Sequence, residues 1–491
     1  MTISDSEYQA WLANPAAARE LLLEAHAYRH DAIEMLRLSR SGYISHASDS
    51  PAHTTYDGVI IEPVTITRQL NGLSGQASRA WGDIVFANPE GLMDAWLTEA
   101  TFAGHPVSLK LGDPAWSLAD FRTALTGVGG RLSYAGAALR LEVHDHGATL
   151  DRPVQSNLLT SGPETDNPKP LLYGRVYNTS PVLIDATVRV YQLHDGALQS
   201  VDAVRDNGVL LTAVTDYSVD LANGAITLVS EPAGQITVDA VSTTQTAADI
   251  IEALVTREAL TSGDLDADAF AALNTLCPQP LGLYIRQRRN LVDAIQEVAA
   301  SVGAWWGFTR LGKFTVGRMP DLSTPGDPVL DLGPDDLHAE IPRHEPLDAP
   351  PWRIRLGYHR HWTVQDADGL AGSVSAEARA AFSQEYSTAS ASDAAIQTQW
   401  SLASDPDQIP ALLADEADAS TEASRRLTQN QSARHKWTFR TQAGALAADL
   451  GDVVRITHPH IPSWENGRSG IVTALRETPS DNHIDITLVT S

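Results

Sequence analysis

The chain has 491 residues, 43% hydrophobic and 20% charged, which is enough apolar material for three or four domains of about 100–200 residues each. Its 61 acidic and 35 basic residues give a formal net charge of −26, which repels phosphate backbones and excludes nucleic-acid binding through a basic surface. A single cysteine, Cys277, excludes an internal disulfide framework and a cysteine-rich metal site.

The negative charge leaves two interpretations open. Fixed negative charge suits a conduit through which DNA slides without adhering, but the simpler interpretation is an acidic surface that keeps a protein soluble. The first residues are acidic and contain no apolar segment, and no apolar run approaches the roughly 20 residues of a membrane span. We therefore expect no secretory signal, no membrane anchor, and folding in the cytoplasm of the cell that makes the chain.

Residues 1–158 are predicted to form a mainly β domain. Asn14 is a favourable helix N-cap and Pro15 suits the first helical turn, so we expect a short helix over the alanine- and leucine-rich segment that follows. Runs of alternating and β-branched residues, separated by turn residues, then predict strands. These runs are AIEMLRLS, YDGVIIEPVTITRQL, WGDIVFAN, HPVSLKLG and RLEVHD.

One of these runs, VTITRQL, alternates strictly along its length. A period of two predicts a strand with one face against a core. The alternation places on one face Val64, Ile66 and Arg68, and on the other Thr65, Thr67 and Gln69.

The clearest pattern in the chain lies in residues 171–245. Short β-branched segments are punctuated there by Ser-Pro, Asp-Gly and Asn-Gly steps, which are typical of tight hairpin turns. The preceding segment TSGPETDNPKP, residues 160–170, has no periodicity and predicts a linker at a domain boundary. We therefore expect a β-hairpin or sandwich domain over 171–245, placed in the chain as an insertion would be.

Helical periodicity begins at Thr246 and defines a third region, residues 246–325. We expect Gly303 to end its last helix, and WWGFTRLGKFTVGRM to form a hairpin with its tip at residues 311–313. Cys277 lies in an apolar phrase and is expected to be a small buried hydrophobic residue. The apolar stripe of the last helix consists of Leu291, Ala294, Ile295, Val298 and Val302.

Residues 326–491 return to strand patterns and are predicted to form a C-terminal β domain. A long helix is expected from about Ile409 to Asn430, with acidic residues in its first half and arginines in its second, an order that suits the helix dipole. The predicted strands are WRIRLGYHRHWTV, HKWTFRT, DVVRITHP, GIVTALRE and HIDITLVTS.

Three His-x-His pairs are the nearest approach to a metal-ligand pattern. Residues i and i+2 of a strand share a face, so each pair can present two imidazoles to one zinc ion. No HExxH or similar spacing supplies a third ligand, so we expect histidines on strand surfaces or interfaces and no metal site. The pairs are His144 and His146, His359 and His361, and His458 and His460.

No catalytic motif stands out. Nothing singles out two of the 61 acidic residues as an acid–base pair, and there is no GxSxG elbow and no GxxxxGK[ST] loop. The glycine-rich segment 127–130 is too short and wrongly framed to cradle a phosphate. We therefore expect no enzymatic activity and no cofactor.

Bulky aromatic residues gather on two short elements. Trp305, Trp306 and Phe308 belong to the predicted hairpin, and Tyr358 and Trp362 to a late strand. Packing in a core is one explanation. The other is that they anchor a contact between identical subunits, because Trp and Tyr are enriched at interface hot spots. Both explanations stay open, and the five residues are candidate interface anchors.

Four separated phrases resemble the tail proteins of long-tailed bacteriophages, and together they cover nearly the whole chain. The resemblance is specific to tail proteins and less specific to one position in the tail. The phrases are the hairpin region YGRVYNTSPVLID…YQLHDG…DYSVDLANGAITL, the N-terminal YDGVI with WGDIVFANPEGLMDAW, the central GAWWGFTRLGKFTVG, and the C-terminal LGDVVRIT with GIVTALRE.

The resemblance implies a tail-tip or baseplate hub of a siphophage-type phage or a related gene-transfer particle. The implied fold is mainly β with an α+β module: small β-barrel or sandwich hub domains accompany a helix-and-hairpin domain. Hubs of this family are homotrimers with two similar barrel-like domains per subunit, which adapt to the six-fold tail tube, close it and form its channel.

The implied location is the tail tip of the virion. The implied partners are further copies of the chain, the distal tail protein, the tape-measure protein and other baseplate or fibre proteins, with DNA only as transient cargo. A peripheral receptor- or glycan-binding tail protein is the alternative, and exposed aromatics at the hairpin tips would favour it. A cell-wall-degrading tail enzyme is a weaker alternative. The candidate aromatics are Tyr173, Tyr177, Tyr191 and Tyr217.

Overall fold

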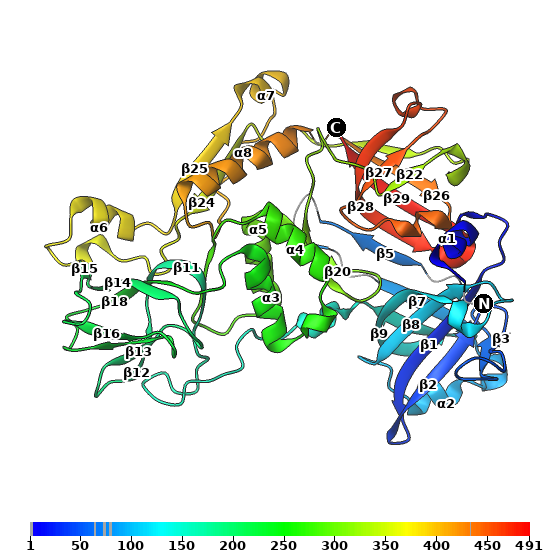
Figure 1. Ribbon diagram of the computed structural model, residues 1–491, viewed down its shortest axis with the longest axis horizontal. Helices are drawn as coiled ribbons and strands as arrows, with labels where there is room; N and C mark the ends of the chain where they lie inside the picture. The colour runs from blue at the N-terminus through cyan, green and yellow to red at the C-terminus, as the bar shows by residue number, and fades with distance from the viewer. Residues whose placement is uncertain (1–2, 63–64, 72–74, 78–80, 433) are drawn as a thin grey trace.

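The computed structural model describes residues 3–62, 65–71, 75–77, 81–432 and 434–491. Figure 1 shows three parts in a row: two β units at one end, a group of helices in the middle, and a hairpin-rich lobe at the other end. The protein is β-rich, with several separate sheets and helices concentrated at its centre. The β-rich, multi-sheet part of the predicted fold class is confirmed, and the small barrel or sandwich hub domains and the α+β module stay predictions.

The first β unit follows the strand order β5-β7-β10-β9-β8-β1-β2-β4-β3, and its neighbours are antiparallel apart from β2 and β4. The two-residue strand β6 does not belong to this sheet and pairs instead with a hairpin formed by residues 304–318, called the central hairpin below. The elements of this part are α1 (Asp5–Ala13), β1 (Glu20–Arg29), β2 (Ala32–Ser39), β3 (Tyr43–Ile44), β4 (Thr55–Gly58), β5 (Ile66–Gln69), β6 (Gly75–Gln76), β7 (Trp81–Ala87), α2 (Asp94–Glu99), β8 (Pro106–Gly112), β9 (Arg122–Ala135) and β10 (Ala138–His144).

The helix predicted after Asn14 is wrong. The helix α1 lies before Asn14, which caps its C-terminus, and a capping box at Ser4 starts it. The alanine- and leucine-rich segment forms β1 instead, and both of its faces are buried: Leu21 and Leu23 point into the large core of the β units, and Leu22 packs in a separate aromatic cluster. Burial between two partner strands outweighs the helix propensity of this segment.

The second β unit comes from the end of the chain, and β28 joins it to the first. Because β28 pairs with β5, the two units share one continuous sheet, which runs on through β29, β26 and β23. The strands of the first unit and the strands within residues 330–346 and 435–490 therefore meet edge to edge. The strands of this unit are β22 (Leu330–Leu332), β23 (Arg343–Pro346), β26 (His435–Thr441), β27 (Val453–Ile456), β28 (Arg468–Thr478) and β29 (His483–Thr490).

The middle of the predicted C-terminal domain leaves this unit and packs on the central helices. Its apolar side chains belong to the same core as those of the central helices, so the packing divides residues 326–491 between two parts of the molecule. The predicted long helix is α8, which begins later than expected. The elements are β24 (Arg353–Tyr358), α6 (Ala376–Phe382), β25 (Ser387–Ser392), α7 (Ala394–Gln399) and α8 (Glu416–Ser432). Of these, α6 lies against the hairpin-rich lobe, where the guanidinium of Arg205 lies over the ring of Phe382.

The central part follows the sequence expectations closely. Thr246 caps α3 by accepting a hydrogen bond from the N–H of Asp249, and the entire predicted stripe of α5 is buried. Gly303, with φ of 64°, turns the chain into the hairpin of β20 and β21 at the expected place. The elements are α3 (Ala247–Glu258), α4 (Ala267–Leu276), β19 (Gly282–Ile285), α5 (Leu291–Ser301), β20 (Ala304–Phe308) and β21 (Phe314–Arg318).

The hairpin-rich lobe consists of two small sheets that share one core, and all of its strands lie within the predicted region 171–245 apart from β19, which extends one sheet. The orders are β15-β14-β18-β11-β19 and β12-β13-β17-β16. The strands are β11 (Leu171–Thr179), β12 (Val182–Asp185), β13 (Val190–Gln192), β14 (Ser200–Asp206), β15 (Val209–Leu210), β16 (Tyr217–Asp220), β17 (Ala225–Leu228) and β18 (Ile236–Val241).

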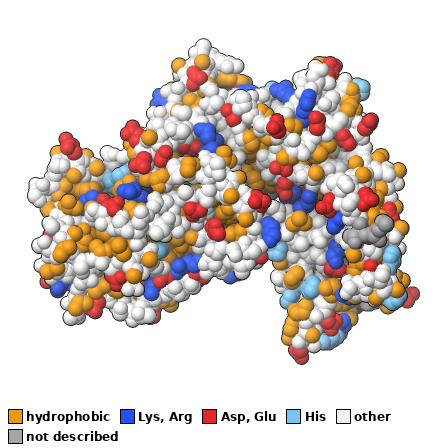
Figure 2. All heavy atoms as spheres, viewed as in Figure 1, with side chains coloured by type: hydrophobic (Ala, Val, Ile, Leu, Met, Phe, Trp, Pro, Cys, Tyr) orange, Lys and Arg blue, Asp and Glu red, His pale blue; other side chains and the backbone are white. Residues whose placement is uncertain are grey.

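The surface carries its charge widely. Figure 2 shows acidic side chains scattered over all parts of this face, and hydrophobic side chains gathered over the hairpin-rich lobe at the left. The exposed hydrophobic residues of that lobe include Val188, Leu210, Val214, Leu221 and Val229. Among the described residues, no helix is both long and apolar enough to cross a membrane.

Candidate functional site

The junction between the two β units is built around Arg68 of β5. As the alternation of this strand predicted, Ile66 and Arg68 are buried while Thr67 and Gln69 are exposed; Val64 lies outside the described residues. The prediction put a cation on the apolar face of the strand. A buried cation requires a partner, but the sequence pattern could not say which carboxylate supplies it.

The partners of Arg68 come from the far end of the chain. Its guanidinium lies 3.2 Å from the carboxylate of Glu477 in β28 and 2.5 Å from that of Asp449. Arg310, at the tip of the central hairpin, approaches Glu477 from another side at 3.3 Å. The side chains of Arg68 and Glu477 are only 3% and 1% exposed. Three segments distant in sequence thus meet in one buried charge network.

The electrostatics of this network favour the ionised forms. Burial lowers the pKa of the Arg68 guanidinium, but attraction to Glu477 and Asp449 and hydrogen bonds to both outweigh it, so the pKa is raised. Moving the two partners of a buried ion pair apart would leave unpaired charges in a medium of low polarity, which is strongly unfavourable. The network therefore fixes how the two β units sit against each other.

The central hairpin is fastened to the first β unit at two more points. The carbonyl oxygen of Arg310 accepts a hydrogen bond from the N–H of Thr126 at 2.8 Å. The side-chain oxygen of Gln296 accepts one from the indole N–H of Trp306 at 3.1 Å and one from the N–H of Gln76 in β6 at 3.0 Å. The strand β20 also pairs in parallel with β6. These contacts join the helical part to the first β unit beside the Arg68 network.

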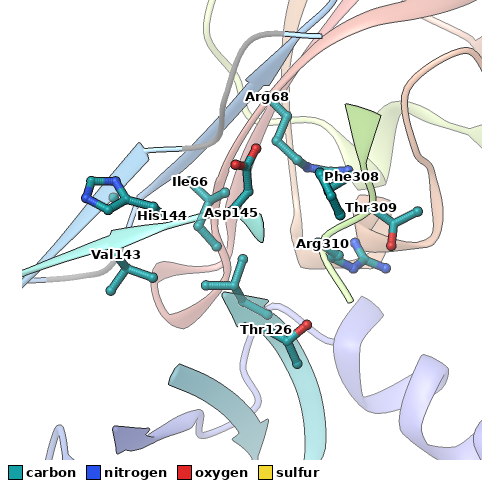
Figure 3. A pocket seen from close by; sticks show the side chains of 11 residues that line it. Ile66, Arg68, Thr126, Val143, His144, Asp145, Phe308, Thr309 and Arg310 are labelled. Carbon is teal, nitrogen blue, oxygen red and sulfur yellow. The ribbon is translucent and has the colours of Figure 1, made fainter. Parts of the chain in front are cut away.

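A small cavity of about 20 Å³ lies inside this junction. Figure 3 shows side chains from β5, β10 and the central hairpin around it, with Arg68 and Arg310 on one side and His144 on the other. A volume of this size holds about one water molecule. This cavity itself therefore has no room for a substrate, whereas a wider hollow of about 360 Å³ is lined by Thr67 and Gln69 of β5 together with Arg476 of β28.

The histidine pairs do not assemble a metal site in the part of the chain that the structure describes, where no three His, Cys, Asp or Glu side chains gather suitably. The ring of His359 stacks on Tyr177 at 3.6 Å and lies 5.3 Å from that of His361. The rings of His458 and His460 are 6.0 Å apart. Burial lowers the pKa of both His359 and His458.

The five candidate interface anchors fall into two groups. Trp305 is buried in the core of the β units, and Trp306 and Phe308 are buried in the core of the helical part. Tyr358 and Trp362 are half-buried, so only these two keep side-chain surface for a partner. An interface role for the five stays a prediction.

The tyrosines of the hairpin-rich lobe do not form the exposed aromatic surface that would favour a receptor-binding protein. Tyr173 and Tyr217 are buried, Tyr177 is covered by His359, and Tyr191 is half-buried. Aliphatic side chains such as Val214 stand out on this lobe instead.

The solved structures to which the chain is similar include tail proteins, each at low sequence identity. No family model matches it, and no curated protein matches its sequence. A tail protein from Neisseria meningitidis is 10% identical, with a TM-score of 0.42 over 96% of this chain and 97% of that chain. The 43 kDa tail protein of prophage MuSo2 from Shewanella oneidensis is 11% identical, with a TM-score of 0.41 over 96% and 98%.

A chain in the virion of a native gene transfer agent particle is 12% identical, with a TM-score of 0.46 over 69% of this chain and 87% of that chain. At such identities and TM-scores the similarity does not assign a role to any residue, so the function rests on the residues of the chain itself.

Proposed function

We propose that the chain is a non-enzymatic hub of a siphophage-type tail tip, a homotrimer that closes the distal end of the tail tube and encloses its channel. The observation that carries this proposal is the pairing of β5 with β28, which sets two β units edge to edge in one sheet. Three such subunits supply six β units around one axis, the number that a six-fold tube presents to its end.

The buried network supports this role because a ring closes only when its building blocks keep a fixed angle. Arg68, Glu477 and Arg310 tie both β units and the central hairpin together, so the subunit can act as one body at the junction. We propose barrel-like hub domains for the two β units and no cofactor.

The partners follow from this position in the particle. The hub would contact further copies of itself, the distal tail protein, the tape-measure protein and other baseplate or fibre proteins, within the virion and after assembly in the host cytoplasm. DNA would pass as transient cargo. The net charge of −26 supports a channel that disfavours phosphate adhesion.

The test is the symmetry of the purified full-length chain. Light scattering should give the mass of a trimer, and particle images should show a three-fold axis surrounded by six β units. Acidic side chains should outnumber basic ones on the inner surface. A chain that stays monomeric at assembly concentrations, or a trimer with no channel or with a channel lined by Lys and Arg, would contradict the proposal.

A further inference from the structure

An open cleft of about 500 Å³ lies where the hairpin-rich lobe, the central part and the segment after β24 meet. Beyond β19 the chain carries three arginines within four residues, Arg286, Arg288 and Arg289, and all three line the cleft. The rest of the lining consists of Ser180, Gln235, Tyr284, Ile285, Gln287, Trp362 and Thr363. The lining of this cleft, as far as the described residues show, contains these cations without any Asp or Glu, although the chain has 61 acidic and 35 basic residues.

One guanidinium of the cleft is left without a carboxylate. Arg286 pairs with Glu164 at 2.5 Å and Arg289 with Glu297 at 2.5 Å. Arg288 is exposed and forms no ion pair with any residue that the structure describes. On a surface that is acidic overall, this gives a local site that attracts an anion. A planar guanidinium suits the two oxygens of a carboxylate or phosphate.

The walls of the cleft are held by hydrogen bonds between its segments. The hydroxyl of Tyr284 donates to the carbonyl oxygen of Ser180 at 2.9 Å, and the hydroxyl of Thr363 donates to that of Ser180 at 2.9 Å. The amide of Gln235 donates to the same Ser180 hydroxyl at 3.2 Å. These contacts fix the spacing of the lining before any ligand arrives, which lowers the entropy that binding costs.

The neutral part of the lining narrows the chemistry of the ligand. Ser180, Thr363 and Gln235 carry groups that both donate and accept hydrogen bonds, as a sugar hydroxyl does. The half-buried indole of Trp362, stacked on the guanidinium of Arg360 at 4.0 Å, adds a flat apolar wall. A volume of about 500 Å³ falls within the usual range for small ligands.

We propose that this cleft binds a sugar unit that carries a carboxylate or a phosphate, with Arg288 as the main contact to the anionic group. An acidic peptide is the less suitable occupant, because poly-acidic side chains would use the cations of the cleft but would place no flat ring face against the indole of Trp362. The site is independent of the hub role, since its lining comes from one subunit and does not include the junction of the β units.

The test is calorimetric titration of the full-length chain with four probes. These are an oligogalacturonate, a phosphomannan fragment, an uncharged dextran of similar length, and poly-glutamate. We expect one or both of the anionic carbohydrates to bind, and the choice between them identifies a carboxylate or a phosphate source. Dextran and poly-glutamate should bind at least about tenfold more weakly, a difference of about 1.4 kcal/mol.

The variants Arg288→Gln and Arg343→Gln form a matched pair. Arg343 is also an exposed arginine without an ion pair among the described residues, but it lies on β23, outside the lining of this cleft. Arg288→Gln should weaken carbohydrate binding by about tenfold or more, and Arg343→Gln should leave it unchanged.

Equal weakening by both variants, binding of poly-glutamate as tight as that of the carbohydrate, or no binding of either anionic carbohydrate would overturn the proposal. Light scattering on the same samples reports the trimer separately. Failure to form a trimer and failure to bind carbohydrate are therefore measured separately.

Discussion

The junction at Arg68 and the cleft at Arg288 use the same side chain in opposite ways. Arg68 is buried and contacts two carboxylates, whereas Arg288 is exposed and contacts none among the described residues. Water solvates an exposed guanidinium at little cost, but a buried one costs several kcal/mol unless it is paired. Complete pairing at the junction is therefore a condition of folding, while the open position in the cleft remains available to a ligand.

This difference separates stability from binding. Changes to the junction should weaken the fold of the β units, and changes to the cleft should leave the fold intact and affect only what the cleft binds. The substitutions below test both halves of this contrast.

Glu477→Ala should have the largest effect. It leaves Arg68 and Arg310 without their shared carboxylate at a position that is 1% exposed. We expect a loss of about 5 kcal/mol in the free energy of unfolding, near the upper end for a broken buried pair. Urea unfolding followed by tryptophan fluorescence measures it. The comparison is Asp449→Ala, which removes a 37% exposed carboxylate and leaves Glu477 on Arg68, so it should cost clearly less than Glu477→Ala. Equal losses in the free energy of unfolding would show that the burial of the carboxylate does not determine the size of the effect.

Trp306→Ala should cause the second-largest loss of stability. Its ring is 1% exposed in the core of the helical part, and truncation of a buried aromatic leaves a cavity that costs about 4 kcal/mol. The half-buried Trp362 is the matched comparison, and Trp362→Ala should cost clearly less. If Trp306 were instead an interface anchor, the variant would keep its melting temperature while trimer assembly failed. Thermal melts and light scattering together separate these results.

Local signals explain which elements could be predicted from the sequence. The stripe of α5, the turn at Gly303 and the hairpin that follows depend on residues close together in the chain, and the structure has them where expected. The alternation that put Ile66 and Arg68 on one face was also confirmed. In each case a period or a turn residue fixes the local geometry without reference to distant strands.

Distant partners explain what could not be predicted. The strand β1 was interpreted as a helix because its burial on both faces depends on β2 and β8. The strand β9 was missed because its glycines resemble turn residues; a side chain at Gly127 would meet the carbonyl oxygen of His144 at 2.4 Å, so the partner strand requires glycine there. Glu477 and Asp449 were missed as partners of Arg68 because no spacing relates residues so far apart in the chain.

His194 is a buried histidine that stays neutral in the folded protein, and it gives a prediction about pH. It is buried beside the ion pair of Arg257 and Asp195, and its Nδ1 accepts a hydrogen bond from the N–H of Leu172 at 2.9 Å. Burial, with a contribution from Arg257, lowers the pKa of His194 from 6.5 to about 4.

Because the pKa of His194 is lower in the folded state, the unfolded chain binds more protons between pH 6.5 and 4, and stability should fall as the pH falls through this window. We expect a loss of about 2–3 kcal/mol from this residue, with no change above pH 7. Urea midpoints measured across the window check it. His194→Asn keeps an acceptor for Leu172 and should reduce the slope; an unchanged slope would assign it to other groups.

Arg288→Gln should have the smallest effect on stability and so completes the contrast with Glu477. The side chain is exposed and has no ion pair to lose within the described part of the chain. Surface changes of this kind alter the free energy of unfolding by no more than about 0.5 kcal/mol. Arg288→Glu should be similarly tolerated, although it reverses the charge that faces an anionic ligand, so carbohydrate binding should vanish while the urea midpoint stays within error of the unmodified chain. A destabilisation comparable to that of Glu477→Ala would make Arg288 a part of the fold and would remove the distinction between the two sites.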